Sequence, residues 1–232
     1  MKILSLCVCI LICSGVFSME PREVIRKMQQ VYKDLTSYEY TCRYELFKGH
    51  KSTEVADAYD GKFCRSKAGY YQQIGQAEFV YAESFFLKVN HSEKAVALNL
   101  PQKNVQQQAD LEQALKHCSE IKLEDNDTYY TVILKISNTS LVPYSLIRVR
   151  ISKSDYHLLR LDLYYTDMKD FSSVRNKPDM EQPHLRITFG ELNKKPKSTN
   201  HLFSQSTYLK TVNNMLIPTG RCEGYSLIDK RI

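Results

Sequence analysis

The stretch VIRKMQQVYKDLTSYEYTCRYEL, residues 24–46, changes its hydrophobic period in the middle. Before Thr36 the apolar residues fall on one stripe of a helix, and Pro21 suits the first turn of that helix; the stripe is Val24, Met28, Val31, Tyr32 and Leu35. After Ser37 the period becomes two, and one side of the chain carries Tyr38, Tyr40, Cys42, Tyr44 and Leu46. The stretch predicts a helix followed by a strand with one wet face.

The same alternation returns along the rest of the chain, interrupted by turn signals at Asp60-Gly61, Ala68-Gly69 and Asn90-His91-Ser92. Residues 106–118 return to helical spacing and predict a covering helix, whereas the polar, proline-broken residues 169–183 predict a long loop. Strands are predicted at residues 79–82, 85–89, 95–100, 129–136, 144–151, 158–165 and 185–189, with shorter ones at 207–212 and 225–228. The fold class is therefore α+β: one large curved antiparallel sheet, an unclosed half-barrel, with an N-terminal helix and a covering helix.

The first 18 residues have the order of an export signal. Lys2 supplies a positive start, an apolar run follows, and small or compact residues precede Met19. The run is about half the roughly 20 residues that cross a bilayer, so it predicts cleavage rather than a membrane span. We expect a single domain over residues 19–232, exported to the periplasm as a soluble protein.

The motifs of secreted hydrolases are missing, since GxSxG, HExxH and glycine-rich phosphate loops do not occur. The six histidines lack metal-ligand spacing, and the net charge of +6 comes from scattered basic residues, which argues against nucleic acid. We therefore expect no catalysis, cofactor or metal, although carboxylate pairs assembled in space leave an enzyme as an alternative. Four cysteines follow the signal, Cys42, Cys64, Cys118 and Cys222, and are compatible with one or two disulfides or with buried thiols.

Aromatic residues are abundant, with sixteen tyrosines, nine phenylalanines and no tryptophan. An ordinary core accounts for most of them, but a strongly curved sheet can also enclose a space that one or two helices leave unfilled. An acyl chain fits such a space, because fifteen buried methylenes contribute roughly 12 kcal/mol before association costs.

Three stretches carry a resemblance to a known family: LTSYEYTCRY at residues 35–44, DGKFCRSKAGYYQQIG at 60–75 and AESFFLKVNHSEKAVALN at 82–99. Their order of helix, alternating strand, meander, covering helix and second meander is similar to the LolA/LolB-like fold of Gram-negative lipoprotein carriers. The similarity covers nearly the whole chain after the signal and contains no short diagnostic motif. It implies an unclosed barrel with a helical lid over an apolar cavity that carries the acyl chains of lipoproteins and catalyses nothing.

The resemblance also implies a lid contact. In the carriers a basic residue precedes a proline shortly after a glycine that corresponds to Gly61, which places Lys67 and Ala68 at those positions, with Arg65 nearby. Here Ala68 replaces the proline, and Lys67 lacks the planar fork of an arginine. Lid gating by Arg65 or Lys67 is thus one hypothesis, and an exposed strand charge is the other.

The predicted ligand is a lipid or lipoprotein acyl chain, and an envelope protein partner is the alternative, for an interaction or sensing module on the same scaffold. The side chains predicted to form the cavity wall are equally compatible with an ordinary core; they are Tyr38, Tyr40, Tyr44, Leu46, Phe79, Tyr81, Leu161 and Leu163.

Overall fold

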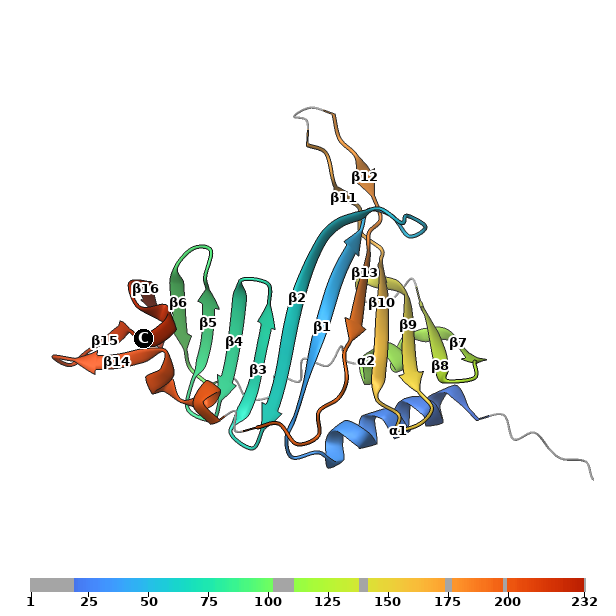
Figure 1. Ribbon diagram of the computed structural model, residues 1–232. Helices are drawn as coiled ribbons and strands as arrows, with labels where there is room; N and C mark the ends of the chain where they lie inside the picture. The colour runs from blue at the N-terminus through green and yellow to red at the C-terminus, as the bar shows by residue number, and fades with distance from the viewer. Residues whose placement is uncertain (1–18, 102–110, 138–141, 174–176, 198–199, 232) are drawn as a thin grey trace, which may run out of the picture.

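The computed structural model describes residues 19–101, 111–137, 142–173, 177–197 and 200–231 (Figure 1). The predicted export signal lies outside these residues, and so does the predicted helical segment 106–110. Among the described helices, none is both long enough and apolar enough to cross a membrane.

The first half of the chain forms a helix and a meander of strands. Its elements are α1 (Pro21–Asp34), β1 (Tyr38–Phe47), β2 (Val55–Ser66), β3 (Gly69–Ile74), β4 (Ala77–Ala82), β5 (Phe86–Asn90) and β6 (Ala95–Asn99). The second half adds α2 (Leu111–Lys116), β7 (Cys118–Asp125), β8 (Tyr129–Ile136), β9 (Tyr144–Ser152), β10 (Leu158–Tyr165), β11 (Lys169–Asp170), β12 (Met180–Glu181) and β13 (His184–Phe189). The C-terminal part contains the 3-10 helices η1 (Asn200–Phe203), η2 (Gln205–Thr207) and η3 (Gly220–Cys222), with strands β14 (Leu209–Val212), β15 (Met215–Pro218) and β16 (Ser226–Asp229).

Twelve strands form one sheet in the order β16-β6-β5-β4-β3-β2-β1-β13-β10-β9-β8-β7. Neighbouring strands are antiparallel except β16, which pairs with β6 in parallel. The hairpin β11–β12 extends beyond the ends of the long strands as an arm (Figure 1). The structure confirms the predicted α+β class with a large, unclosed, mainly antiparallel sheet.

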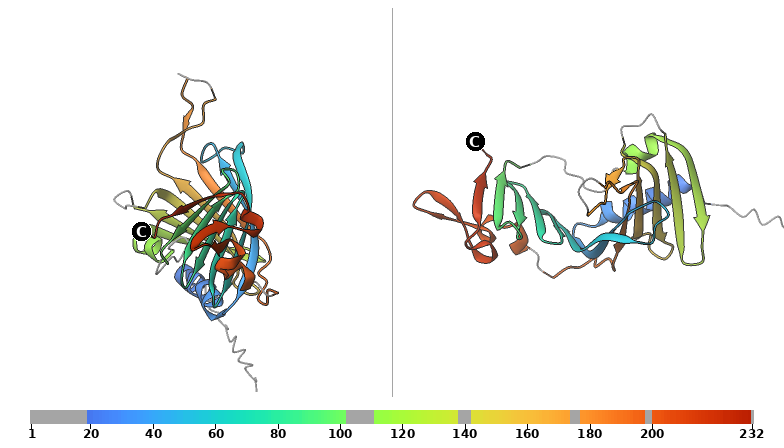
Figure 2. Two further views of the ribbon diagram at one scale, coloured as in Figure 1. Left: turned by 90° about the vertical axis from the view of Figure 1, so that its left-hand side faces the viewer. Right: turned by 90° about the horizontal axis from the view of Figure 1, so that it is seen from above.

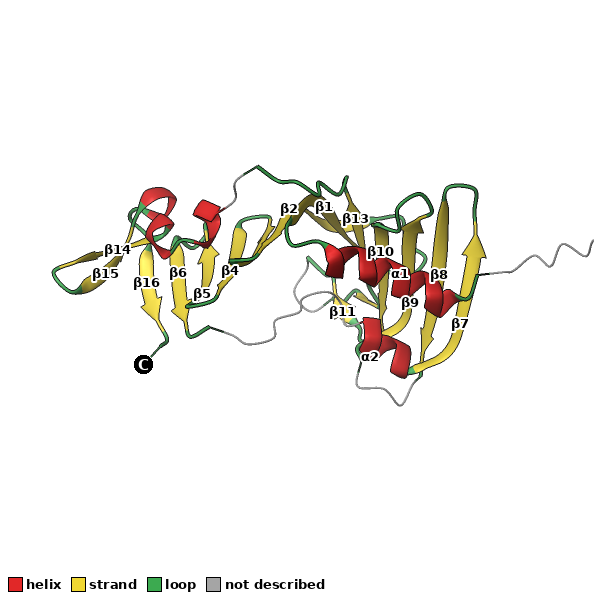
Figure 3. Ribbon diagram, turned by 90° about the horizontal axis from the view of Figure 1, so that it is seen from below, coloured by secondary structure: helices red, strands yellow, loops and turns green. Residues whose placement is uncertain are grey.

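The sheet has two hydrophobic cores, one on each face. Side chains directly opposite each other on paired strands share a face. Tyr40 lies opposite Phe63, and both pack against the core of α1, α2 and β7–β10. The next residue, Cys64, points to the opposite face. There it shares a second core with Tyr71 and Val80, which lie on the same face by register. Figures 2 and 3 show α1 and α2 on one side of the sheet at one end, and the C-terminal elements on the other side at the other end.

We call the side of α1 and α2 the helix face and the opposite side the outer face. α1 is amphipathic and buries Val24, Ile25, Met28 and Tyr32 against the helix face. On the outer face, residues 200–222 form a C-terminal clasp, which buries Leu202, Tyr208 and Cys222 against β3–β6. The helices therefore cover one face at one end of the sheet, and the clasp covers the opposite face at the other end.

Three local predictions are wrong. Asp60 and Gly61 do not form a turn but lie inside β2, where alternation simply continues. Cys118 does not end the covering helix but begins β7, a strand that the charged alternation of residues 118–125 did not reveal. Residues 169–183 are not wholly a loop, because they contain β11 and β12. Cys42, Cys118 and Cys222 are free thiols.

Candidate functional site

The strand register places all eight predicted wall residues on the helix face. Tyr44 lies opposite Ile187, which lies opposite Leu161, and Leu46 is joined to Leu163 through Leu185 in the same way. In the other direction, Tyr40 is joined to Phe79 through Phe63 and Gln72, and Tyr38 is joined to Tyr81 through Arg65 and Tyr70. The register therefore brings the chosen sides of β1, β4 and β10 to one face of the sheet.

The eight residues differ in what covers them. Tyr38, Leu161 and Leu163 are buried in the core beneath the helices, so they act as core residues. Tyr44, Leu46, Phe79 and Tyr81 are only partly buried. Tyr40 is also partly exposed and packs at the margin of the helix core. Three of the predicted residues thus belong to the core, and the other five lie on a partly exposed surface that adjoins it.

The open part is an aromatic strip that crosses β1–β5. We define the strip as Tyr40, Phe63, Tyr70, Phe79, Tyr81 and Phe86, which share the helix face by register. Tyr40 and Phe63 stack with ring centroids 5.1 Å apart, and Tyr81 and Phe86 stack at 4.4 Å. The helices do not extend over β3–β6, as Figure 3 shows. The strip is consequently a partly accessible apolar surface rather than a filled core.

Burial keeps three of the tyrosine hydroxyls on this face neutral at physiological pH. Burial raises the pKa of Tyr40 well above the ordinary value of 10.0, and burial also raises the pKa of Tyr44 and of Tyr81. Gln72 donates from Nε2 to the Tyr44 hydroxyl oxygen at 3.2 Å. Lys88 stands at the margin of the strip, with Nζ 5.7 Å from the Phe79 ring centroid. The face thus offers apolar rings with the cation of Lys88 at its β5 edge, which suits an amphipathic ligand.

The residues of the predicted lid contact differ in position. Arg65 lies on the helix face, where Nη1 donates to the Tyr32 carbonyl oxygen in the last turn of α1 at 3.4 Å. The Arg65 guanidinium also lies 5.4 Å from the Tyr70 ring centroid. Lys67 is exposed in the turn between β2 and β3. Arg65 therefore joins α1 to the aromatic strip, whereas Lys67 is a surface charge.

Sequence reasoning missed Phe63, Tyr70 and Phe86. The signal for Phe63 was present, because the alternation from Tyr59 through Gly61 to Phe63 is regular. The turn signal Asp60-Gly61 masks this alternation, because a turn at that point breaks the phase of β2. Phe86 follows another phenylalanine, Phe85, so the two do not show which one faces the strip. Phe85 is buried in the core beneath the C-terminal clasp.

A separate polar cavity lies between the β1–β2 turn and the arm. Its volume is about 540 Å³, and its lining is mostly charged or polar; it consists of Lys48, Gly49, His50, Lys51, Ser52, Glu54, Met168, Asp179, Glu181 and Gln182. Lys48 forms ion pairs with Glu54 at 2.9 Å and Asp179 at 3.4 Å. These contacts tie the arm to the β1–β2 turn, and this cavity is unsuited to an apolar chain. Across the described ranges, no group of three or more His, Cys, Asp or Glu side chains could hold a metal ion.

Comparison with known proteins gives fold matches only. No protein-family model and no curated protein matches the chain. Among solved structures, an uncharacterized conserved protein from Thermus thermophilus is 9% identical, with a TM-score of 0.49 over 90% of this chain and 98% of that chain. The Mycobacterium tuberculosis lipoprotein LppX is 14% identical, with a TM-score of 0.39 over 76% and 97%. A LolA superfamily protein from Nitrosomonas europaea is 11% identical, with a TM-score of 0.29 over 82% and 99%.

Identities this low concern the fold and not the function.

Proposed function

We propose that this protein binds lipid or lipoprotein acyl chains along the aromatic strip and carries them without chemical change. The observation that supports the proposal is the strip itself, a neutral apolar surface that continues the helix core onto β2–β5. Burial of each methylene against such a surface contributes about 0.8 kcal/mol, so a long chain needs few polar contacts. The export signal expected at residues 1–18 would bring the protein to a compartment where acyl-bearing lipids must cross water.

The position of Lys88 supports an amphipathic ligand. Its side chain is exposed and its ammonium group lies over the Phe79 ring at the strip's margin. A carboxylate or phosphate at the end of an acyl chain would meet this cation while the chain lies along Tyr81 and Phe86. The proposal therefore places the ligand's head toward β5 and its tail toward the helices.

The test is binding of a fluorescent fatty-acid probe to the detergent-free protein, with native mass spectrometry after purification. The variant Tyr81→Ala/Phe86→Ala removes the stacked pair and should lower probe affinity about tenfold. Its matched control is Val212→Ala/Met215→Ala on the β14–β15 hairpin, where both side chains are exposed, at 41% and 65%. This control should bind as the parent does.

Failure of the parent protein to take up the probe, together with a ligand-free mass, would overturn the proposal. Equal affinity in the Tyr81→Ala/Phe86→Ala variant and its control would also overturn it. Circular dichroism of all three proteins separates loss of binding from loss of fold.

A further inference from the structure

The outer face of β9, β10 and β13 carries four arginines around one buried acid. Asp162 lies opposite Arg148 on one neighbouring strand and opposite Arg186 on the other, and Arg160 precedes it by two residues. Arg160 lies opposite Arg150. Side chains in such positions stand about 5 to 7 Å apart, so the four guanidinium groups form one compact group. We call Arg148, Arg150, Arg160 and Arg186 the arginine patch.

The single acid cannot neutralise the patch. Asp162 is 3% exposed and accepts from Arg160 Nε at 2.7 Å and from Arg186 Nε at 2.8 Å. In the described part of the chain, Arg148 and Arg150 have no acidic partner. Glu45 of β1 lies opposite Arg186 on the same face. Four positive charges therefore meet two negative ones, which leaves a surplus of two. Like charges placed directly opposite each other are destabilising, so the pairing of Arg150 with Arg160 lowers the stability of the sheet at this point.

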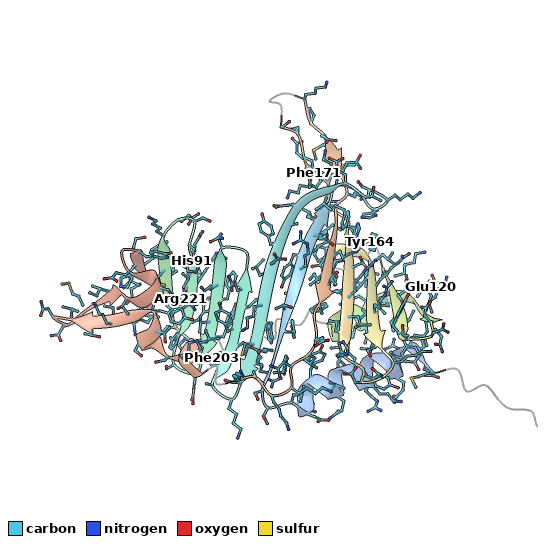
Figure 4. The ribbon with its side chains drawn as sticks, viewed as in Figure 1. His91, Glu120, Tyr164, Phe171, Phe203 and Arg221 are labelled. Atoms are coloured by element: carbon cyan, nitrogen blue, oxygen red, sulfur yellow. The ribbon has the colours of Figure 1, made fainter. Side chains whose placement is uncertain are left out.

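The surplus is confined to these three strands. On β1, Arg43 forms ion pairs with Asp60 at 2.8 Å and Glu45 at 3.8 Å. On β7, Lys122 forms an ion pair with Glu120 at 2.8 Å. The flanking strands β1 and β7 thus carry acids beside their cations, and the surplus of positive charge lies on β9, β10 and β13. Figure 4, which views the outer face of β7–β10, shows Tyr164 and Glu120 on this side.

Aromatic rings hold three of the four guanidinium groups in place. Arg150 lies 4.2 Å from the Tyr129 ring centroid, Arg186 lies 4.9 Å from that of Phe47, and Arg148 lies 5.8 Å from that of Tyr164. Stacking of this kind leaves the planar edge of the guanidinium free to form paired hydrogen bonds with phosphate oxygens. The patch is thus ordered before any partner arrives, which lowers the entropy cost of binding.

We propose that the arginine patch binds the anionic headgroups of a phospholipid surface. β9, β10 and β13 are interior strands, and each is paired on both sides, so their backbone groups are not available to an added peptide strand. What this face presents is an array of cations with half-buried tyrosines beside them, which are the side chains found where proteins meet headgroups. The patch is on the side opposite the aromatic strip, so the protein could lie on a membrane while its helix face stays open. This inference does not rest on the proposed acyl binding.

The experiment is sedimentation of the protein with vesicles of phosphatidylcholine alone and with vesicles containing about 30% phosphatidylglycerol. The parent protein should bind only the anionic vesicles, and added salt should release it because charge pairs are screened. The variant Arg148→Gln/Arg150→Gln removes two charges that hold no ion pair, so the fold should survive. Its partition should fall about 25-fold, at about fivefold for each arginine near an anionic surface.

The matched control is Lys195→Gln/Lys197→Gln, which removes two exposed charges in the loop after β13. It should keep its partition within about threefold of the parent. Equal binding of the parent to neutral and anionic vesicles, or equal losses in the two variants, would overturn the inference. Fatty-acid probe affinity should be the same in all three proteins, so a failed acyl-binding test and a failed vesicle test are told apart.

Discussion

Arg221 of the C-terminal clasp donates from Nη2 to Glu78 Oε2 on β4 at 2.6 Å, and Glu78 is 2% exposed. The second carboxylate oxygen of Glu78 lies 2.6 Å from His91 Nε2, and Arg221 also donates to the Tyr208 hydroxyl at 2.7 Å. This ion pair joins a buried carboxylate to an arginine 143 residues away and fastens the clasp to the outer face. Figure 4 shows His91 and Arg221 together at this end of the sheet.

Replacing the buried acid should loosen the clasp. Glu78→Gln keeps the side-chain volume but leaves Arg221 without a charged partner, so we expect a loss of about 2 kcal/mol in the free energy of unfolding. Urea unfolding measures it, and Glu83→Gln at an exposed position nearby is the matched control. A change as small as that of the control would show that the pair does not hold the clasp.

Asp162 makes stability depend on pH in the acid range. Burial disfavours its charged form, but contact with His184 and hydrogen bonds from Arg160 and Arg186 outweigh burial and hold the pKa of its carboxyl below the ordinary value of 3.8. A lowered pKa in the folded state adds stability that is complete above the unfolded pKa of about 3.9 and is lost as the pH falls toward the folded value.

Asp162→Asn should therefore cost about 2 kcal/mol at pH 7 and progressively less below about pH 4. Urea unfolding of parent and variant at a series of pH values from 3 to 7 measures the difference in their free energies of unfolding. A difference in the free energy of unfolding that stays constant over this range would contradict the lowered pKa of Asp162.

The contact between Arg65 and α1 gives a prediction for ligand release. If α1 covers the ligand, Arg65→Leu removes the hydrogen bond to the Tyr32 carbonyl and should raise the dissociation rate of a bound fatty-acid probe about fivefold. Lys67→Leu, in the nearby turn, is the control and should leave the rate unchanged. Stopped-flow displacement measures both rates, and equal rates in the two variants would remove Arg65 from any gating role.

Gly61 is required by close packing rather than by backbone conformation. A Cβ at this position would lie 2.7 Å from Tyr44 Cε2, 2.8 Å from the Gln73 carbonyl oxygen and 2.9 Å from Cys42 Sγ. Gly61→Ala should cost about 1 to 3 kcal/mol, because a paired backbone carbonyl cannot easily move. Adding Cys42→Ala should restore only part of the loss. Full recovery of stability in the double variant would show that the clash with the Cys42 thiol alone accounts for the loss.

Periodicity was enough to predict much of this fold. The switch between Leu35 and Tyr38 gave α1 and β1, and the alternation at residues 129–136 and 158–165 gave β8 and β10 with the observed bounds. It also put the wall residues of each strand on one side of that strand, whereas their common face across β1, β4 and β10 comes from the pairing register.

What parity could not predict is which core each face meets. Tyr71 and Val80 are as apolar as Tyr70 and Phe79, yet only the first two are sealed by the clasp. Residues 200–222 contain no long periodic run, so their packing on the outer face depends on long-range contacts such as Arg221 with Glu78. The arginine patch could not be predicted from the sequence for a similar reason. Its members come from three strands and become neighbours only when the strands pair.

The two cores on opposite faces give the molecule two units of local stability. β1 and β2 lie between them, with Tyr40 and Phe63 facing the helix core and Cys64 facing the clasp core. Amide hydrogen exchange should therefore separate into two groups, one for β3–β6 and one for β7–β10, each opening with its own free energy. Loss of the clasp would then melt one end of the sheet and leave the helix end folded.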